Sequence, residues 1–339
     1  MNRFNVRYLF WWWIFVIGYF LGNYWFFLSQ THQDDIKWWE DYMVRDTSSV
    51  YKYISPLLEC ELTSISNHTK YVPFEWVSKV RIRNEIQSQY PDVSLALYVR
   101  SLNNGPWFGI NENLAFSPAS LMKLPIFITY MKWMEKNPAI IEQDIIPSEL
   151  ILPYEPMYPA SNTVQVWKSY KPKDLLESMI IKSDNLALQS LLFSLPEDIN
   201  KTVLTELWIH LPENLNVGDF LTIQQYASLF RILYNAAYLS RDSSEYALSV
   251  LARSEFKEGI RQWIPEKVSI AHKFWERGYI DEKTKKEVKQ LHDCGIVYYK
   301  QYPYLLCIMT RWNNFSELSK VLGQTAKIIH EEISKAFPE

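Results

Sequence analysis

The feature that most restricts how this chain can fold is residues 116–123, in which a serine is followed three residues later by a lysine. Pro118 stands near a first helical position and apolar residues recur through residues 124–131, so a helix is predicted to begin here. In a helix, Ser120 and Lys123 lie on one face. A lysine buried among apolar neighbours favours its neutral form and can take a proton from the adjacent hydroxyl. The pair is a candidate nucleophile and base, although this spacing is common in helices that perform no chemistry.

Two further polar motifs follow Ser120. A Ser-Asp-Asn triplet occupies residues 183–185 between two apolar helical runs, and Lys273 follows residues 268–271, which are predicted to form a strand. The triplet alone is typical of a helix N-terminus, because these three residue types are preferred caps. A Ser-x-x-Lys pair, a Ser-Asp-Asn triplet and a strand lysine in this order resemble the class A β-lactamases and related penicillin-recognising serine hydrolases. The resemblance covers about residues 78–335.

This resemblance implies a role for each motif residue. Ser120 would be the nucleophile that becomes acylated, and Lys123 would be its base. Ser183 would relay a proton toward the leaving group. Asn185 would bind the substrate amide and Lys123, and Lys273 would supply positive charge and bind an anionic group.

The resemblance also implies an α+β fold, in which an antiparallel sheet is flanked by helices and joined to an all-helical subdomain, with the active site between the two. The sequence agrees, because strand-like runs occur early and late and helical runs lie between them. Pro125 falls within the helix of the Ser120 motif and is expected to cost a hydrogen bond there. The predicted strands are 93–99, 107–110, 268–274, 293–299 and 304–310, and the predicted helices include 77–88, 244–251 and 315–337.

The strand motif departs from the family pattern. That pattern has a threonine or serine and then a glycine after the lysine, whereas this chain has Phe274 and Trp275. Phe274 cannot donate the hydrogen bond that binds a substrate carboxylate, and Trp275 carries a large side chain where the pattern has none. Arg277 is the expected carboxylate partner instead. The backbone N–H groups of Ser120 and Glu276 are expected to form an oxyanion hole.

A second departure concerns the glutamate that activates the hydrolytic water in class A enzymes. The family places this glutamate four residues before an asparagine, but here Pro212 occupies that position relative to Asn216, and Glu213 comes one residue later. A glutamate in a surface loop is usually only a solvated charge, so Glu213 is a secondary candidate for the deacylating base. Without such a glutamate an acyl-enzyme would persist, as in penicillin-binding proteins.

Composition argues against several other functions. The chain of 339 residues has a formal net charge of −3 and no basic block, so a nucleic-acid-binding surface is not expected. Three cysteines are too few for a disulfide scaffold, and no Cys-x-x-Cys or histidine cluster predicts a metal, so no cofactor is expected. Cys294 and Cys307 would lie opposite each other in a terminal hairpin. Two buried thiols are favoured there over a disulfide.

The N-terminus predicts a membrane anchor. Residues 8–28 contain no formal charge and are long enough to span a bilayer. Arg3 and Arg7 precede this run and acidic residues follow it, so the N-terminus is expected in the cytoplasm and the remaining chain outside. A cleaved signal peptide is the alternative, but no small-x-small site follows the run. The expected domains are an anchor at 1–29, a juxtamembrane segment at 30–76 that either docks on the domain or acts as a spacer, and a hydrolase domain at 77–339.

Three functions fit these observations. The first is a membrane-anchored serine hydrolase that acts on a β-lactam or a related amide. The second is a cell-wall D-Ala-D-Ala peptidase, which the missing glutamate and the outward topology favour. The third is a degenerate domain that binds a peptidoglycan peptide or a protein, favoured if Phe274 and Trp275 close the cleft. Because Ser120, Lys123 and Ser183 are all retained, the enzymes are the preferred hypotheses.

Overall fold

A computed structural model describes residues 51–55, 72–103, 105–117, 119–150, 157–159, 163–209, 219–281 and 284–338. These residues belong to one compact unit that spans Val44–Glu339. The predicted membrane anchor, most of the predicted juxtamembrane segment and Glu213 lie outside the described residues. Within the described ranges, no helix is both long enough and apolar enough to cross a bilayer.

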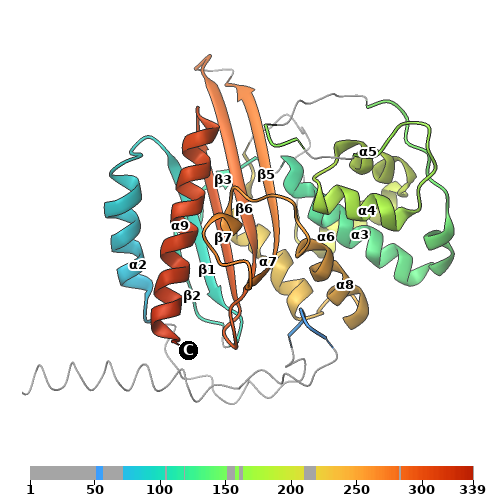
Figure 1. Ribbon diagram of the computed structural model, residues 1–339. Helices are drawn as coiled ribbons and strands as arrows, with labels where there is room; N and C mark the ends of the chain where they lie inside the picture. The colour runs from blue at the N-terminus through green and yellow to red at the C-terminus, as the bar shows by residue number, and fades with distance from the viewer. Residues whose placement is uncertain are drawn as a thin grey trace, which may run out of the picture. The chain divides into compact units, whose positions relative to one another are not determined.

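Five antiparallel strands form the central sheet in the order β2-β1-β7-β6-β5 (Figure 1). Pairing of β1 with β7 brings the early and late parts of the domain together, and β5 forms one edge of the sheet. All five predicted strands are present. The strands are β1 (Ser94–Ser101), β2 (Trp107–Ile110), β5 (Ser269–Ile280), β6 (Glu287–Tyr298) and β7 (Tyr304–Trp312).

β5 and β6 are longer than the sequence predicts. The apolar run that marks β5 ends at Trp275, but ladder pairing with β6 continues to the pair Ile280 and Glu287. Hydrogen bonds to a neighbouring strand maintain the extended backbone even where the side chains are polar and exposed. The additional length carries Glu276 and Arg277 along the edge of the sheet.

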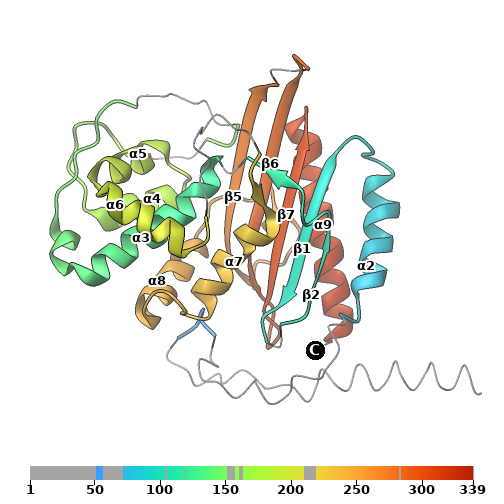
Figure 2. The same cartoon turned by 180° about the vertical axis from the view of Figure 1, so that it is seen from behind.

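Helices cover both faces of the sheet. On one face, α9 (Phe315–Ala336) packs against β6 and β7, and α2 (Glu75–Arg81) and the π-helical segment η2 (Ile82–Gln87) lie beside α9 (Figure 1). On the other face lies α7 (Ile223–Tyr234) (Figure 2). α7 begins with a capping box, in which the side chains of Thr222 and Gln225 satisfy each other's backbone N–H groups.

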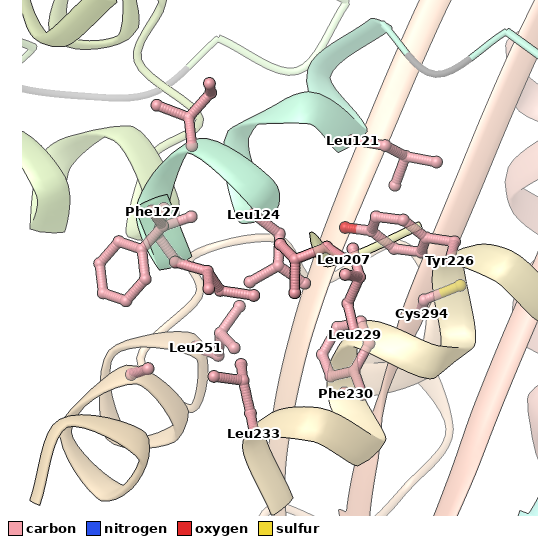
Figure 3. Close-up of a cluster of buried hydrophobic side chains, with 14 of the residues drawn as sticks. Leu121, Leu124, Phe127, Leu207, Tyr226, Leu229, Phe230, Leu233, Leu251 and Cys294 are labelled. Carbon is pink, nitrogen blue, oxygen red and sulfur yellow. The ribbon is translucent and has the colours of Figure 1, made fainter. Parts of the chain in front are cut away.

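The remaining helices form a group beyond the β5 edge of the sheet (Figures 1 and 2). The side chains of Leu121, Leu124 and Phe127 meet those of α7 and of α8 (Arg241–Leu251) in a continuous hydrophobic core (Figure 3). An antiparallel sheet with flanking helices and a helical subdomain is therefore confirmed. This subdomain contains α3 (Lys123–Lys136), α4 (Pro172–Ile181), α5 (Asn185–Ser194), α6 (Glu197–Glu206) and α8 (Arg241–Leu251).

The helix at the Ser120 motif begins differently from the prediction. Residues Ala119–Met122 form a 3₁₀ turn, and α3 begins at Lys123. Pro125 is therefore the third residue of α3, within the first turn, where a backbone N–H has no acceptor inside the helix. The expectation that Pro125 costs a hydrogen bond is wrong for this reason.

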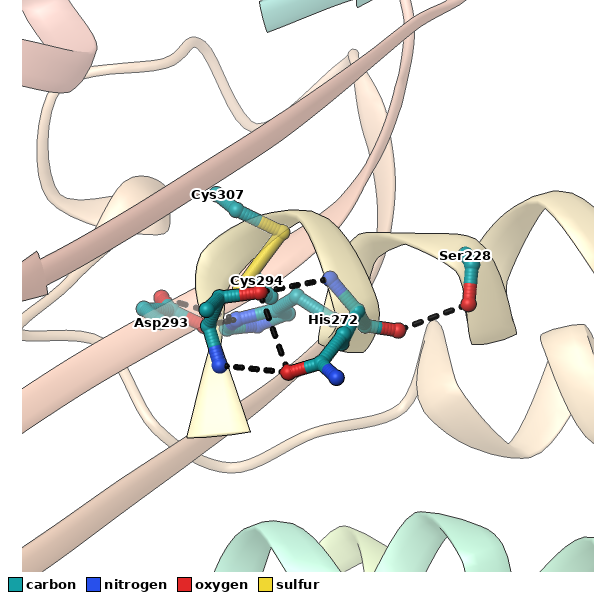
Figure 4. Close-up of a disulfide and its surroundings, with 7 residues drawn as sticks. Ser228, His272, Asp293, Cys294 and Cys307 are labelled. Carbon is teal, nitrogen blue, oxygen red and sulfur yellow. Dashed lines mark hydrogen bonds and ion pairs between the residues drawn. A yellow bond between two sulfur atoms is a disulfide. The ribbon is translucent and has the colours of Figure 1, made fainter. Parts of the chain in front are cut away.

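Cys294 and Cys307 lie directly opposite each other on β6 and β7, as predicted, with their Cα atoms 4.0 Å apart. They form a disulfide (Figure 4). The expectation of two buried thiols is wrong, because opposed positions of an antiparallel pair bring the two sulfur atoms within bonding reach.

Part of the predicted juxtamembrane segment docks on the domain. The backbone N–H groups of Tyr53 and Ile54 donate to the Glu245 carboxylate of α8 at 2.7 and 2.9 Å. The N–H of Ser55 donates to the carbonyl of Tyr234 at the end of α7, at 2.6 Å. Residues 51–55 are thus held by the helices, which decides between docking and spacing for this stretch.

Candidate active site

Lys123 lies at the centre of a polar cluster that joins α3 to the start of α5. Its Nζ donates to the Ser183 carbonyl at 2.5 Å, to Ser183 Oγ at 3.0 Å and to Asn185 Oδ1 at 2.7 Å. These contacts bring together three of the predicted site residues from motifs about 60 positions apart. Ser120 is half-buried in the 3₁₀ turn that leads directly into Lys123.

The environment of Lys123 favours a neutral amine. The side chain is completely buried, and this burial lowers its pKa to about 7, against the opposing charges of Asp184 and Glu276. Loss of hydration destabilises the charged form of a buried lysine. Near neutral pH, a substantial fraction of this lysine can therefore accept a proton.

The connection between α4 and α5 positions the second motif. Ser183 adopts a left-handed conformation with φ of 57°. The Asp184 carboxylate caps α5 by accepting the N–H groups of Leu186 and Ala187, and also accepts Ser178 Oγ at 3.0 Å and Val164 N at 2.7 Å. The capping interpretation of the triplet is thus correct for Asp184, while Ser183 and Asn185 turn to Lys123.

A side-chain network holds the segment that precedes Ser120 against the sheet. Gln290 Oε1 on β6 accepts the Ser117 N–H at 3.1 Å, and Gln290 Nε2 donates to Asp219 at 2.9 Å. Arg277 on β5 donates to Ser117 Oγ. Arg277, the predicted carboxylate ligand, therefore lies beside the segment that precedes Ser120, where it holds Ser117.

The side chain of Lys273 is completely buried. Its Nζ has no hydrogen-bond partner among the described residues and lies 4.4 Å from the ring centre of Phe274. Burial lowers the pKa of Lys273 well below its ordinary value, and repulsion from Lys123 adds to this effect. The charge of Glu276 acts on the pKa of both lysines, so Lys273 lies near the Lys123 cluster. Next to Lys273, His272 Nδ1 lies 2.9 Å from Asp293 Oδ1 on the neighbouring strand β6 (Figure 4).

The side chains of Phe274 and Trp275 point in opposite directions, as alternation along a strand requires. Trp275 is completely buried in the core and makes an edge-to-face contact with His292 at a centroid distance of 3.6 Å. Phe274 stacks on Phe256 at 3.9 Å. Trp275 is therefore a core residue, and its bulk lies away from the β5 edge.

Glu276 contributes a buried carboxylate as well as the backbone N–H that the sequence suggested. One oxygen accepts the N–H of Met157 at 3.0 Å and the other accepts the N–H of Tyr158 at 3.3 Å. Burial raises the pKa of Glu276, and the two N–H donors and both lysines oppose that rise. The carboxylate thus tethers residues 157–159 to β5. Within the described residues, no group of three or more His, Cys, Asp and Glu side chains could hold a metal ion.

A profile of the beta-lactamase enzyme family matches residues 78–333, which is most of the chain. The chain belongs to the beta-lactamase enzyme family. It is a β-lactamase-like serine hydrolase. A comparison with curated protein sequences finds no match.

Solved structures show the same fold. PBP-A shares 19% identity, with a TM-score of 0.63, and the alignment covers 76% of this chain and 96% of PBP-A. A PBP-A mutant captured as an acyl-enzyme complex with penicillin G shares 18% identity with a TM-score of 0.62, over 77% of this chain and 97% of the mutant. A β-lactamase from Sphaerobacter thermophilus shares 15% identity with a TM-score of 0.62, over 78% and 99% of the two chains.

Sequence reasoning missed parts of this beta-lactamase-family site. The cap formed by Asp184 was not among them, because the triplet itself gave a signal for it. The carboxylate role of Glu276 and the packing of Phe256 and Tyr158 around Phe274 had none, because these contacts join segments 18 or more positions apart. Only the tertiary structure brings them to the β5 edge.

Proposed function

We propose that the protein hydrolyses a β-lactam or a related amide through an acyl-enzyme formed at Ser120. The observation that carries this proposal is the buried amine of Lys123, the first residue of α3. Lys123 follows Ser120 by three residues, and its amine contacts Ser183 and Asn185. An amine with a pKa near 7 is matched to general-base catalysis at neutral pH.

Acylation follows from these roles. Neutral Lys123 takes the proton of Ser120 Oγ as that oxygen attacks the substrate carbonyl carbon. The backbone N–H groups of Ser120 and Glu276 stabilise the oxyanion. When the C–N bond breaks, the proton passes from Lys123 through Ser183 Oγ, 3.0 Å away, to the leaving nitrogen. Asn185 orients both the substrate amide and Lys123, and Lys273 acts electrostatically in its protonated form.

Deacylation requires water to attack the ester carbonyl, with the alkoxide of Ser120 leaving and regaining a proton. Glu213 is the base that the sequence suggests for this step. Replacing Glu213 by glutamine separates the two half-reactions, because acylation would continue while the acyl-enzyme accumulates.

We expect Ser120→Ala in the full-length chain to abolish turnover of a chromogenic cephalosporin and covalent labelling by a fluorescent penicillin, because no nucleophile remains. Ser228→Ala is the matched control, since the Ser228 hydroxyl donates within α7, to the Gln225 carbonyl at 2.6 Å. Undiminished labelling of the Ser120→Ala variant would show that the covalent adduct forms at another residue.

A cell-wall D-Ala-D-Ala peptidase is the second candidate, favoured by Pro212 in the position of the family's deacylating glutamate. Stable labelling of Ser120 without turnover of the cephalosporin is its expected signature. The third hypothesis, a binding domain with a closed cleft, loses the support of Trp275, which is buried in the core.

We also propose that residues 8–28 anchor the protein in a membrane with the hydrolase domain outside the cytoplasm and the N-terminus inside it. The uncharged run and the preceding arginines support this topology. The disulfide between Cys294 and Cys307 also supports it, because disulfides persist in oxidising compartments.

This topology predicts that the full-length chain stays in the membrane fraction after an alkaline carbonate wash. Protease added outside intact spheroplasts should digest the domain while a cytoplasmic marker survives. Domain protected from external protease would contradict the proposed orientation.

A further inference from the structure

The side chain of Gln290 on β6 joins two parts of the chain that lie far apart in the sequence. It is completely buried, and its amide oxygen accepts the N–H of Ser117 at 3.1 Å. Its amide nitrogen donates to Asp219 Oδ1 at 2.9 Å. Gln290 is 173 positions from Ser117 and 71 positions from Asp219, so only the folded chain brings these groups together.

Ser117 leads directly to the proposed nucleophile. It stands three residues before Ser120 and two residues before the 3₁₀ turn Ala119–Met122, which contains Ser120. The strand β3 (Ala115–Phe116) ends immediately before Ser117 and pairs with β4 (Leu221–Thr222). A hydrogen bond to the Ser117 N–H therefore fixes the place where this turn begins.

The chemistry of the two partners decides which way the Gln290 amide points. A backbone N–H can only donate, so Ser117 requires the amide oxygen. An ionised carboxylate can only accept, so Asp219 requires the amide nitrogen. The nitrogen also lies 3.5 Å from Tyr279 Oη, a hydroxyl that fits either orientation. Asp219 therefore holds the amide oxygen toward Ser117, because a reversed amide would set donor against donor and acceptor against acceptor.

Two arginines complete the arrangement. Arg277 on β5 and Arg311 on β7 lie directly opposite Gln290, one on each side, so the three side chains form a row across the sheet. Arg277 donates to Ser117 Oγ, and Arg311 donates to the second carboxylate oxygen of Asp219. Hydrogen bonds from a charged donor are stronger than those between neutral groups. The row thus holds Ser117 at two atoms and fixes Asp219, on which the orientation of Gln290 depends.

We propose that Gln290 is a positioning residue for acylation, which fixes the start of the turn that carries Ser120, and that Asp219 keeps Gln290 in the required orientation. The proposal deepens the function proposed above and rests on it. Gln290 acts through the backbone of Ser117 and not by touching the substrate. A displacement of a reacting atom by about 1 Å can cost on the order of 100-fold in rate. Loss of this hydrogen bond should therefore slow the chemical step and leave substrate binding nearly unchanged.

The measurement is acylation of the full-length chain by penicillin G, followed by rapid quenching and intact-mass spectrometry. Time courses at several penicillin concentrations give a limiting rate constant and a half-saturating concentration, with Ser120→Ala as the blank. Gln290→Met removes both hydrogen bonds and nearly keeps the size of the side chain. We expect its limiting rate constant to fall about tenfold or more, with a half-saturating concentration within about twofold of the wild type. An unchanged limiting rate constant overturns the proposal.

Two variants at Asp219 test the same arrangement outside the core, so they decide the question even where Gln290→Met fails to fold. The Asp219 side chain is partly exposed. Asp219→Asn retains an acceptor oxygen for the Gln290 nitrogen and should keep the limiting rate constant within about threefold of the wild type. Asp219→Ala removes the acceptor and should lower the rate constant about as far as Gln290→Met. Equal rate constants for these two variants overturn the role of Asp219.

Exchange of donor and acceptor tests the direction of the hydrogen bond. Gln290→Glu sets a carboxylate against that of Asp219, where like charges repel, and should lower the limiting rate constant at least as far as Gln290→Met. Addition of Asp219→Asn to Gln290→Glu restores the pair in reverse, because the new amide nitrogen can donate to the new carboxylate, which still accepts the Ser117 N–H. We expect this double variant to recover to within about threefold of the wild type. A double variant as slow as Gln290→Glu overturns the proposal, since packing alone predicts no recovery.

Thr310→Val is the matched control for stability. It removes a buried hydroxyl that donates to the Leu291 carbonyl at 2.6 Å, on the face of β7 opposite to Arg311. We expect a lower unfolding temperature and an unchanged limiting rate constant. A loss of rate equal to that of Gln290→Met would show that the stability of the sheet sets the rate, which overturns the proposal. Failure of penicillin G to acylate the wild-type chain instead refutes the proposed function, and this inference with it.

Discussion

Lys123 is the residue on which the proposed chemistry depends most. It is completely buried, and the oxygens of Ser183 and Asn185 are its acceptors. Carbonyl and hydroxyl oxygens stabilise the charged form less than a paired carboxylate would, so loss of hydration dominates and lowers the pKa to about 7. In the proposed mechanism, protonation of this one amine controls the reactivity of the Ser120 hydroxyl.

We expect the rate constant for acylation of Ser120 to rise as the pH increases through 7 and to level off above it. Below its pKa of about 7, Lys123 is protonated and cannot accept the Ser120 proton; above it, the free amine predominates. Labelling by a fluorescent penicillin from about pH 5 to about pH 9 measures this profile. A rate that falls over the same range would assign the base to another group.

At the scale of elements, the junction of α4 and α5 combines two functions in adjacent residues. Asp184 satisfies the first N–H groups of α5, and Ser183 turns its carbonyl and hydroxyl to Lys123 through a left-handed backbone. A left-handed conformation is unfavourable for a residue with a Cβ atom. An unfavourable backbone conformation at Ser183 thus places its hydroxyl against the Lys123 amine.

Replacing Ser183 by alanine or by glycine should separate these two effects. Both variants lose the proton relay, so we expect acylation to fall about 100-fold or more in each. The glycine variant should be more stable than the alanine variant by about 1 kcal/mol, because glycine adopts the left-handed conformation without strain. Denaturant unfolding measures the difference. An alanine variant as stable as the glycine variant would show that the strain is negligible.

For the whole molecule, contacts between distant segments close the domain. β1 pairs with β7, and Arg81 of α2 forms ion pairs with Glu331 and Glu332 of α9 at 2.9 and 2.7 Å. The disulfide then joins β6 to β7 at the centre of the sheet. It closes a loop with a sequence separation of 13, which limits the unfolded chain.

We expect the double variant Cys294→Ala, Cys307→Ala to lose about 3 kcal/mol of unfolding free energy, since the unfolded chain regains the entropy of this loop. Urea unfolding with and without reductant provides the measurement. Reductant should destabilise the wild-type chain and leave the double variant unchanged. Equal curves for the wild type in both conditions would show that the bond contributes little.

Local patterns were sufficient to predict the positions of the five strands, the terminal helix α9 and the residues around Lys123. These features depend on periodicity and capping within a few residues, which the sequence displays directly. The directions of Phe274 and Trp275, the disulfide, and the tether from Glu276 to residues 157–159 required the tertiary structure. Glu276 and Met157 are 119 positions apart, and no local preference determines which distant N–H groups meet a buried carboxylate. The sequence alone thus determined the polar motifs around Lys123 and the fold class, whereas long-range packing decided which side chains are buried along β5.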